Sequence, residues 1–340
     1  MRALVVANPA ATTTNRRVRD VLLGALSSEL KVDLAETAHR GHGRELGQQA
    51  LAEGVDVVVA LGGDGTVNEV VDGLLTDGPG AHVPTLAVVP GGSTNVFSRA
   101  LGRSRDPIEA TGEILDSLRS GRTRRVSLGT ASATGTSAAP VAGTDPATAA
   151  VAAEADAVAD DTWGPPRWFV FAAGLGFDAD VIARVEAERA RGRRSTGALY
   201  VREATRAFVL GRERRRPSMT LVRPGEPDLD GLFLCLVSNV SPWTYLGPRP
   251  VNPSPEASFD AGLDVFALGR MGVLRMLHHS RQVLARRPDA RGRGVHRFHD
   301  LETLTLTASR PQGWQLDGDH LGTATGLRLR SVPSALSVVA

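Results

Sequence analysis

The chain has 340 residues, of which 42% are hydrophobic and 22% charged, a composition typical of a soluble globular protein with room for two domains. The formal net charge of only +2 argues against a general nucleic-acid-binding protein. No apolar run approaches the roughly 20 residues of a membrane span, and the lone Cys235 excludes an internal disulfide. The segment MRALVVANP has too short an apolar core for a signal peptide, so we expect a cytoplasmic protein.

The first 125 residues alternate apolar runs with helical spacings of three and four. The run VDVVVALG is almost continuously apolar, as expected for a parallel strand covered on both faces. Repeated strand–helix units predict an open parallel α/β sheet with helices on both faces. The predicted strands cover residues 2–8, 31–37, 55–62 and 84–90. The predicted helices cover residues 18–26, 46–51, 67–75, 94–101 and 107–118.

The pattern changes after residue 125. Residues 130–161 consist mainly of Ala, Thr, Ser, Gly and Asp, which predicts a flexible insertion, bounded at 130–165. Short strand patterns with turn residues between many of them then predict an antiparallel β-sandwich. These strands are expected at 167–176, 218–224, 231–240, 262–269, 301–309, 314–321 and 326–332, with helices at 179–190, 197–211 and 271–286. We therefore predict an α/β lobe over 1–125 and a β lobe over 126–325, and leave open a return of residues 326–340 to the first lobe.

The stretch ALGGDGTVNEVVDGL places a carboxylate among glycines where a predicted strand meets a helix. Gly62, Gly63 and Gly65 let the backbone approach phosphate oxygens, and the helix N-terminus supplies unpaired N–H groups. Asp64 would repel a phosphate, which suggests that it holds Mg²⁺ or takes a proton from an attacking hydroxyl. The alternative is a tight turn in which Thr66 or Asp64 caps the helix.

A second glycine-rich turn, PGGSTNVFSRALG over 90–102, follows the next predicted strand and carries the short polar side chains Ser93 and Asn95. Two such loops on neighbouring strand ends favour a polyphosphate ligand over an isolated turn. Asn8 and Pro9 end the first strand, where a simple turn is the alternative. Neither GxxxxGK[ST] nor GxGxxG occurs at these loops, which disfavours an ordinary P-loop NTPase or dehydrogenase.

Together these stretches resemble the diacylglycerol kinase catalytic family, which includes bacterial lipid kinases and sphingosine kinases, with NAD kinases as distant relatives. The resemblance implies an α/β nucleotide lobe, a β-sandwich lobe, and transfer of the ATP γ-phosphate to a lipid hydroxyl with Mg²⁺. Diacylglycerol is the acceptor that the family implies by default. The motifs that carry the resemblance are GGDGTVNE (62–69), PGGSTNVFSRALG (90–102), GLGFDADV (174–181), SPEASFDAGLDVFAL (254–268) and LDGDHLG (316–322).

The resemblance implies catalytic roles for Asp64, which would also hold Mg²⁺, and for Asp319. Asp319 stands where the family motif Asp-Gly-Glu has glutamate, one methylene longer. The stretch LDGDHLG is also the pattern of a β-hairpin with Asp-Gly in a type I′ turn, and both interpretations can hold. The implied ATP-binding residues are Asn8, Pro9, Thr12, Thr37, Gly62, Gly63, Gly65, Thr66, Asn68, Glu69, Gly92, Ser93, Asn95, Asp317 and Gly318.

Three departures from the family pattern leave other functions open. Val96 replaces a common aspartate, Asp319 replaces glutamate, and Asp260-Ala261-Gly262 lacks a carboxylate expected at a second Mg²⁺ site. A non-catalytic nucleotide- or lipid-binding protein is therefore one alternative. A separate alternative is an NAD-kinase-like enzyme with a soluble acceptor, although the long β lobe with LDGD favours a lipid acceptor.

The partners expected are ATP and a lipid at the inner membrane surface, without nucleic acid, and a homodimer is possible. The basic stretch 188–217 is expected to be either a helix on an anionic membrane or an ordinary solvated helix.

Overall fold

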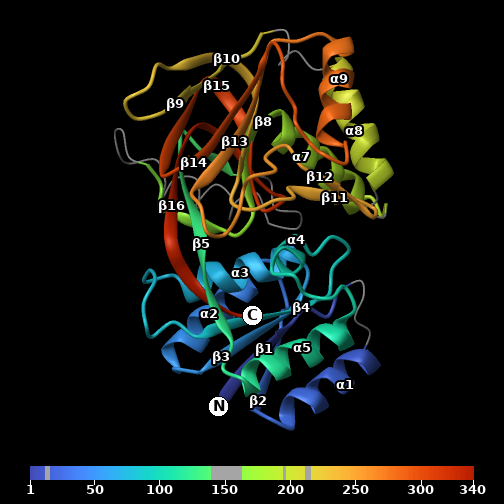
Figure 1. The fold of residues 1–340 in the computed structure, drawn as a ribbon, viewed down its shortest axis with the longest axis vertical. Coiled ribbons are helices and arrows are strands. Elements are labelled where there is room, and N and C mark those ends of the chain that lie inside the picture. Colours follow the sequence, from blue (N-terminus) through green and yellow to red (C-terminus); the bar gives the residue numbers. More distant parts are fainter. Residues whose placement is uncertain (12–15, 139–162, 194–196, 211–215) are drawn as a thin grey trace, which may run out of the picture.

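The computed structural model describes residues 1–11, 16–138, 163–193, 197–210 and 216–340, and every structural statement below concerns these residues (Figure 1). Thr12 lies outside them, as do residues 139–162 of the low-complexity stretch. No helix in these ranges is long and apolar enough to cross a membrane.

The chain opens with a four-stranded parallel sheet, as the sequence predicts, and the strand order is β2-β1-β3-β4. Every residue of β3 is buried, which explains its unbroken apolar sequence. The strands are β1 (Arg2–Ala7), β2 (Lys31–Glu36), β3 (Val57–Gly62) and β4 (Thr85–Pro90).

Helices cover both faces of this sheet because alternate strand residues point to opposite sides. Leu4 and Val6 of β1 join a cluster with α2 and α3, whereas Val5 joins a cluster with α1 and α5. These helices are α1 (Arg16–Ser27), α2 (His42–Ala52), α3 (Asp64–Leu74) and α5 (Pro107–Arg119), and a short α4 (Val96–Ala100) follows the second glycine-rich turn.

The remaining strands pair mainly antiparallel, as predicted, but they continue the same hydrogen-bonded sheet. The order along its main path is β14-β13-β10-β8-β15-β16-β4-β3-β1-β2. The other elements are β5 (Thr123–Thr134), β6 (Ser137–Ala138), β7 (Arg167–Phe169), β8 (Ala172–Gly176), α7 (Phe177–Ala190), α8 (Gly197–Leu210), β9 (Met219–Val222), β10 (Leu229–Ser238), β11 (Thr244–Leu246), β12 (Arg249–Val251), β13 (Leu263–Gly269), α9 (Val273–Val283), β14 (Val295–Leu301), β15 (Thr303–Leu316) and β16 (Asp319–Val339).

The strand β16 joins the two parts of the molecule. It begins at Asp319, pairs with β15 and β5, and ends in a parallel pairing of Val338 with Leu86 of β4 (Figure 1). The sequence patterns at 314–321 and 326–332 predicted two separate strands here. The first pattern instead contains the β15–β16 turn, and everything after it is one strand.

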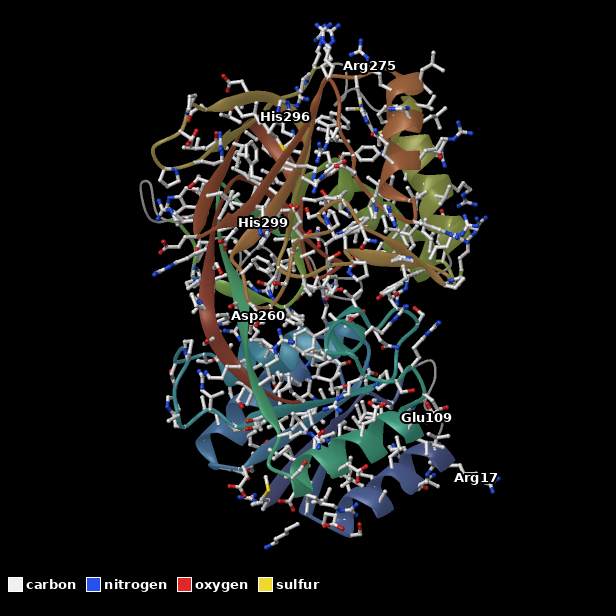
Figure 2. The ribbon with its side chains drawn as sticks, viewed as in Figure 1. Arg17, Glu109, Asp260, Arg275, His296 and His299 are labelled. Carbon is white, nitrogen blue, oxygen red and sulfur yellow. The ribbon has the colours of Figure 1, made fainter. Side chains whose placement is uncertain are left out.

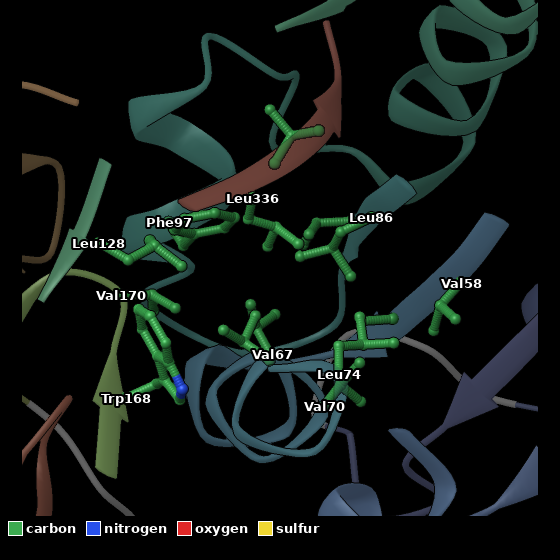
Figure 3. Packing of buried hydrophobic residues seen from close by; sticks show 14 of the residues in the cluster. Val58, Val67, Val70, Leu74, Leu86, Phe97, Leu128, Trp168, Val170 and Leu336 are labelled. Carbon is green, nitrogen blue, oxygen red and sulfur yellow. The ribbon is translucent and has the colours of Figure 1, made fainter. Parts of the chain in front are cut away.

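One hydrophobic cluster spans the same junction. Val67 and Val70 of α3 and Phe97 of α4 pack in it with Leu128 of β5 and Trp168 of β7 (Figure 3). The residues before and after 125 therefore share a continuous core.

The predicted insertion at 130–165 is wrong in its first residues. The strand β5 continues through Thr134, and β6 follows at 137–138. Ala131 and Ala133 alternate into the core, and a Cβ on Gly135 would collide with Oγ1 of Thr325. Small residues at these three positions, which suggested a flexible insertion, therefore belong to closely packed structure.

Candidate functional site

Three turns meet at one edge of the parallel sheet because the strands end in register. Ala7 pairs with Leu61, and Gly62 pairs with Pro90. The turn after β1 starts at Asn8, the turn after β3 contains the GGDG stretch, and the turn after β4 contains the second glycine-rich loop. This carboxyl edge is where open α/β sheets bind ligands.

The two glycine-rich turns pack backbone against backbone. The Gly91 N–H donates to the Gly62 carbonyl at 2.7 Å. A Cβ on Gly92 would lie 2.7 Å from the Gly63 Cα, and a Cβ on Gly91 would lie 2.8 Å from the Gly62 Cα. These distances are too short for a side chain, so mutual contact of the loops itself requires glycine at these positions.

Asn95 shapes the second loop from within. It has a left-handed φ of 50°, its Oδ1 accepts from the Gly92 N–H at 2.9 Å, and its Nδ2 donates to the Gly92 carbonyl at 2.7 Å. Ser93 at the loop tip is exposed. Ser93 is thus free to reach a ligand, whereas the Asn95 side chain is used to hold the turn.

Asp64 is half-buried at the first turn of α3 and faces the start of α4. Its Oδ1 accepts from the Phe97 N–H at 3.2 Å. Burial raises the pKa of Asp64, while backbone N–H groups of residues 95–97 and the Arg99 charge act in the opposite direction. The loop 92–97 therefore orients this carboxylate, and the contact is present with Val96 at the position where the family pattern commonly has aspartate.

Asp319 reaches the same turn from the other end of the sequence. It is the first residue of β16, and a Cβ on Gly65 would lie 3.6 Å from its Oδ2. Its Oδ1 lies 3.7 Å from Nη2 of Arg40. Burial raises the pKa of Asp319, and the charges of Arg40, Arg189 and Arg167 lower it. The structure thus brings the two predicted catalytic acids to the same turn, although their residues are far apart in sequence.

Asp317, predicted to contact ATP, is instead turned into the protein. Its Oδ1 accepts from the N–H groups of Phe171 and Ala172 at 2.8 and 2.9 Å. Its Oδ2 accepts from the Val170 N–H and from Nδ2 of Asn68, each at 2.7 Å. Asp317 and Asn68 are both buried, so they join the hairpin, β8 and α3 rather than opening toward a ligand.

The hairpin turn itself has the predicted form. Asp317 and Gly318 have φ values of 48° and 83°, as a type I′ turn requires, and Leu316 pairs with Asp319. The Gly318 N–H donates to Oε1 of Gln315 at 2.9 Å. Because the side chains alternate across this turn, Asp317 faces the core and Asp319 faces the strand-end edge of the sheet.

The Glu69 carboxylate, like that of Asp317, accepts hydrogen bonds from the protein backbone. Its two carboxylate oxygens accept from the N–H groups of Gly41 and Gly43 at 2.7 and 3.0 Å. These glycines flank the start of α2, just after Arg40. Glu69 thereby fixes the segment from which Arg40 reaches Asp319.

At the end of β1, Asn8 closes the third turn. Its Nδ2 donates to the Thr66 hydroxyl at 3.1 Å, and its Oδ1 accepts from the Ala10 N–H at 2.9 Å. Thr66 is buried, whereas Pro9 is exposed and Thr37, at the end of β2, is half-buried. Asn8 and Thr66 therefore fix two of the turns to each other.

A cavity of about 400 Å³ opens beside this turn, between the strand ends and α1. Arg19 forms an ion pair with Glu36 at its wall. The lining residues are Ala7, Asn8, Pro9, Arg16, Arg19, Glu36 and Leu61.

Sequence reasoning missed Arg99. Its guanidinium lies over the ring of Tyr245, 3.1 Å from the ring centroid, and its charge lowers the pKa of Asp64. The only signal was its position just beyond the second glycine-rich loop. A cation within the electrostatic reach of Asp64 suits a site that handles phosphate.

The donor set around Asp64 fits Mg²⁺, which proteins commonly hold with one or two carboxylates while substrate phosphates complete the shell. The segment Asp260-Ala261-Gly262, where the resemblance implies a second Mg²⁺ site, is different, because Asp260 forms an ion pair with Arg124 at 2.6 Å. Figure 2 shows Asp260 close to β5, which carries that arginine. In this chain a cationic side chain already neutralises Asp260.

The comparisons with known proteins agree with these motifs. Residues 2–131 match the model of the diacylglycerol kinase catalytic domain. The diacylglycerol kinase of Bacillus subtilis is 35% identical over 109 residues, which cover 32% of this chain and 35% of the relative. That of Staphylococcus saprophyticus is 31% identical over 130 residues, covering 38% and 40%. The matched segments thus span only about a third of the length of these relatives.

A solved diacylglycerol kinase structure from Bacillus anthracis superposes with a TM-score of 0.64 at 16% identity, covering 99% of this chain and 96% of that one. This likeness shows a shared fold with mixed α/β content over nearly the whole length. The family membership rests on the sequence: residues 2–131, which match the family model and carry the motifs at the strand-end edge, belong to the diacylglycerol kinase catalytic-domain family.

Proposed function

We propose that the chain is an ATP-dependent kinase that transfers the γ-phosphate to a lipid hydroxyl, with diacylglycerol as the first acceptor to test. The observation that carries the proposal is the meeting of Asp64, Asp319 and two glycine-rich turns at one sheet edge. Phosphoryl transfer is catalysed mainly by positioning and electrostatic stabilisation, for which phosphate-binding N–H groups and a carboxylate that holds the metal or accepts a proton are central parts.

In this proposal ATP lies across the strand ends of residues 1–125. The N–H groups at the start of α3 and in the loop of Gly92 and Ser93 bind its phosphates. Asp64 would hold Mg²⁺, which when bound supplies charge neutralisation on the phosphates. The cavity beside Asn8 offers room for the remainder of the nucleotide.

The acceptor hydroxyl would approach from the side of residues 126–325. Asp64 and Asp319 both flank Gly65, so a hydroxyl placed there has a carboxylate within reach to accept its proton. Burial raises the pKa of Asp319 and the charge of Arg40 acts against that rise, while Arg99 lies where it can stabilise charge on the transferred group. We place the lipid chains along the β-rich part by analogy with the family.

The test is transfer of labelled γ-phosphate from ATP with Mg²⁺ to diacylglycerol, monoacylglycerol and a sphingoid base in mixed micelles, with NAD in parallel. Product on diacylglycerol supports the full proposal, and product on another lipid changes the acceptor only. Phosphorylated NAD would replace the lipid acceptor by a soluble one. No product together with intact ATP binding would overturn the kinase proposal in favour of a binding protein.

A further inference from the structure

The helix α9 presents apolar side chains to solvent. Its inward face packs into the core through Met276 and Val283. On the opposite side Leu274 is 83% exposed and Leu277 is 58% exposed, and Leu284 at the C-cap is also exposed. Spacings of three and seven place these leucines on one stripe. Isolated exposed leucines need no explanation, but a stripe on one helix does.

The Asp, Glu, Lys and Arg content of the segment that contains α9 is entirely basic. Residues 265–288 contain five arginines and no Asp or Glu. None of the five forms an ion pair within the described part of the chain. They are Arg270, Arg275, Arg281, Arg286 and Arg287.

The basic stretch 188–217 is different. Glu188 pairs with Arg191, Arg193 and Arg202 at 2.8, 3.1 and 3.3 Å. Arg202 is further paired with the buried Glu203. Arg191, Arg193 and Arg202 are thus held in ion pairs with nearby carboxylates, whereas the five arginines around α9 form no ion pair among the described residues.

We propose that α9 is an interfacial helix that docks the protein on an anionic phospholipid bilayer. Leu274 and Leu277 would insert at the headgroup level, while Arg275 and Arg281 bind lipid phosphates. At 11 residues α9 is about 16 Å long, which suits a helix lying in the interface plane. Figure 2 places Arg275 at the opposite end of the molecule from Arg17 on α1, so docking there leaves the α1 end free. The proposal rests on the proposed function, because it names the surface by which the kinase would bind the membrane that holds its lipid acceptor.

The first measurement is co-sedimentation of the protein with phosphatidylcholine vesicles that contain or lack phosphatidylglycerol, without ATP. Binding is expected only to the anionic vesicles, and it should weaken as salt is raised. Because this measurement needs no turnover, it stands or fails independently of the kinase assay.

Leu274→Gln with Leu277→Gln should reduce vesicle binding at least about tenfold, because each leucine loses its burial in the interface. The matched control is Val21→Gln with Ile108→Gln, which alters two aliphatic residues, each 53% exposed, on α1 and α5. The control pair should bind like the unaltered protein. All four positions are exposed, so the fold should survive each change.

Arg275→Gln and Arg281→Gln should each lower binding about fivefold at low salt, with Arg17→Gln as the matched control. Equal losses in the α9 and control variants, or tight binding to neutral vesicles, would overturn the proposal. If light scattering shows a dimer that the leucine variants convert to a monomer, the stripe is instead an interface between two copies of the chain.

Discussion

Asp64 and Asp317 both lie among glycines at a tight turn, yet the fold uses them differently. Asp317 receives three backbone N–H groups and the Asn68 amide, which leaves it no open face. Asp64 faces only the loop after β4, where it accepts from the Phe97 N–H at 3.2 Å and the N–H groups of residues 95 and 96 also lower its pKa, and it stays half-buried. An aspartate beside glycine in a tight turn can thus serve the fold or the reaction. Which role it takes depends on the hydrogen-bond donors that distant segments place around its carboxylate.

Among the changes that test this difference between Asp64 and Asp317, the largest expected effect is a loss of stability. Asp317→Ala leaves three buried N–H groups without a partner and should lower the free energy of unfolding by about 4 kcal/mol in urea titrations. The matched change two residues on, Asp319→Ala, removes a half-exposed acid and should cost about 1 kcal/mol or less. Equal losses would mean that the two acids do not differ as the contacts indicate.

Asp64→Asn should have the opposite effects, with little change in stability and a large loss of activity. The amide retains an acceptor for the Phe97 N–H, so the urea midpoint should change little. A neutral group neither holds Mg²⁺ well nor takes a proton, and phosphate transfer should fall by at least about 100-fold in kcat. Full activity in this variant would rule out the proposed role of Asp64.

Asp178 extends the comparison to a third acid. It is buried against Gly174, accepts from Nε2 of Gln315 at 3.0 Å, and burial raises its pKa to about 7. Between the unfolded pKa of 3.8 and this value, the folded state holds a proton that the unfolded state releases. Stability should therefore fall as pH rises through that window.

Asp178→Asn should remove about 4 kcal/mol of the stability change across the window, and the remaining slope reflects other buried acids that titrate there. Urea titrations of both proteins at several pH values measure it. An unchanged slope would mean that Asp178 is already ionised in the folded protein.

The smallest expected effect concerns Arg40. Arg40→Gln removes a charge that lowers the pKa of Asp319, so the acid limb of the activity–pH profile should move to higher pH. The rate at the optimum should fall by no more than about fivefold, since the pair is partly exposed. Arg44→Gln is the control, because Arg44 lies four residues further on, within α2, and is directed to Asp72; this change should leave the limb in place.

Local pattern predicted much of the α/β part, because each strand and helix there follows from periodicity within a few residues. The same holds for the two glycine-rich turns and for the Asp-Gly hairpin. The roles of Asp317 and Glu69 did not follow, because their partners are backbone N–H groups of segments far away in sequence. The single strand β16 was also missed, since Pro333 and the turn residues before Gly326 interrupt its pattern.

The course of β16 has a consequence for how the protein is made. Its residue Val338 pairs with Leu86, about 250 residues earlier, so the parallel sheet is completed only by a late segment. Until then the edge of β4 stays unpaired and its apolar neighbours, such as Leu336, are missing from the core. Residues 1–125 produced alone should therefore aggregate, and a ribosome-bound chain should need protection of that edge until β16 emerges.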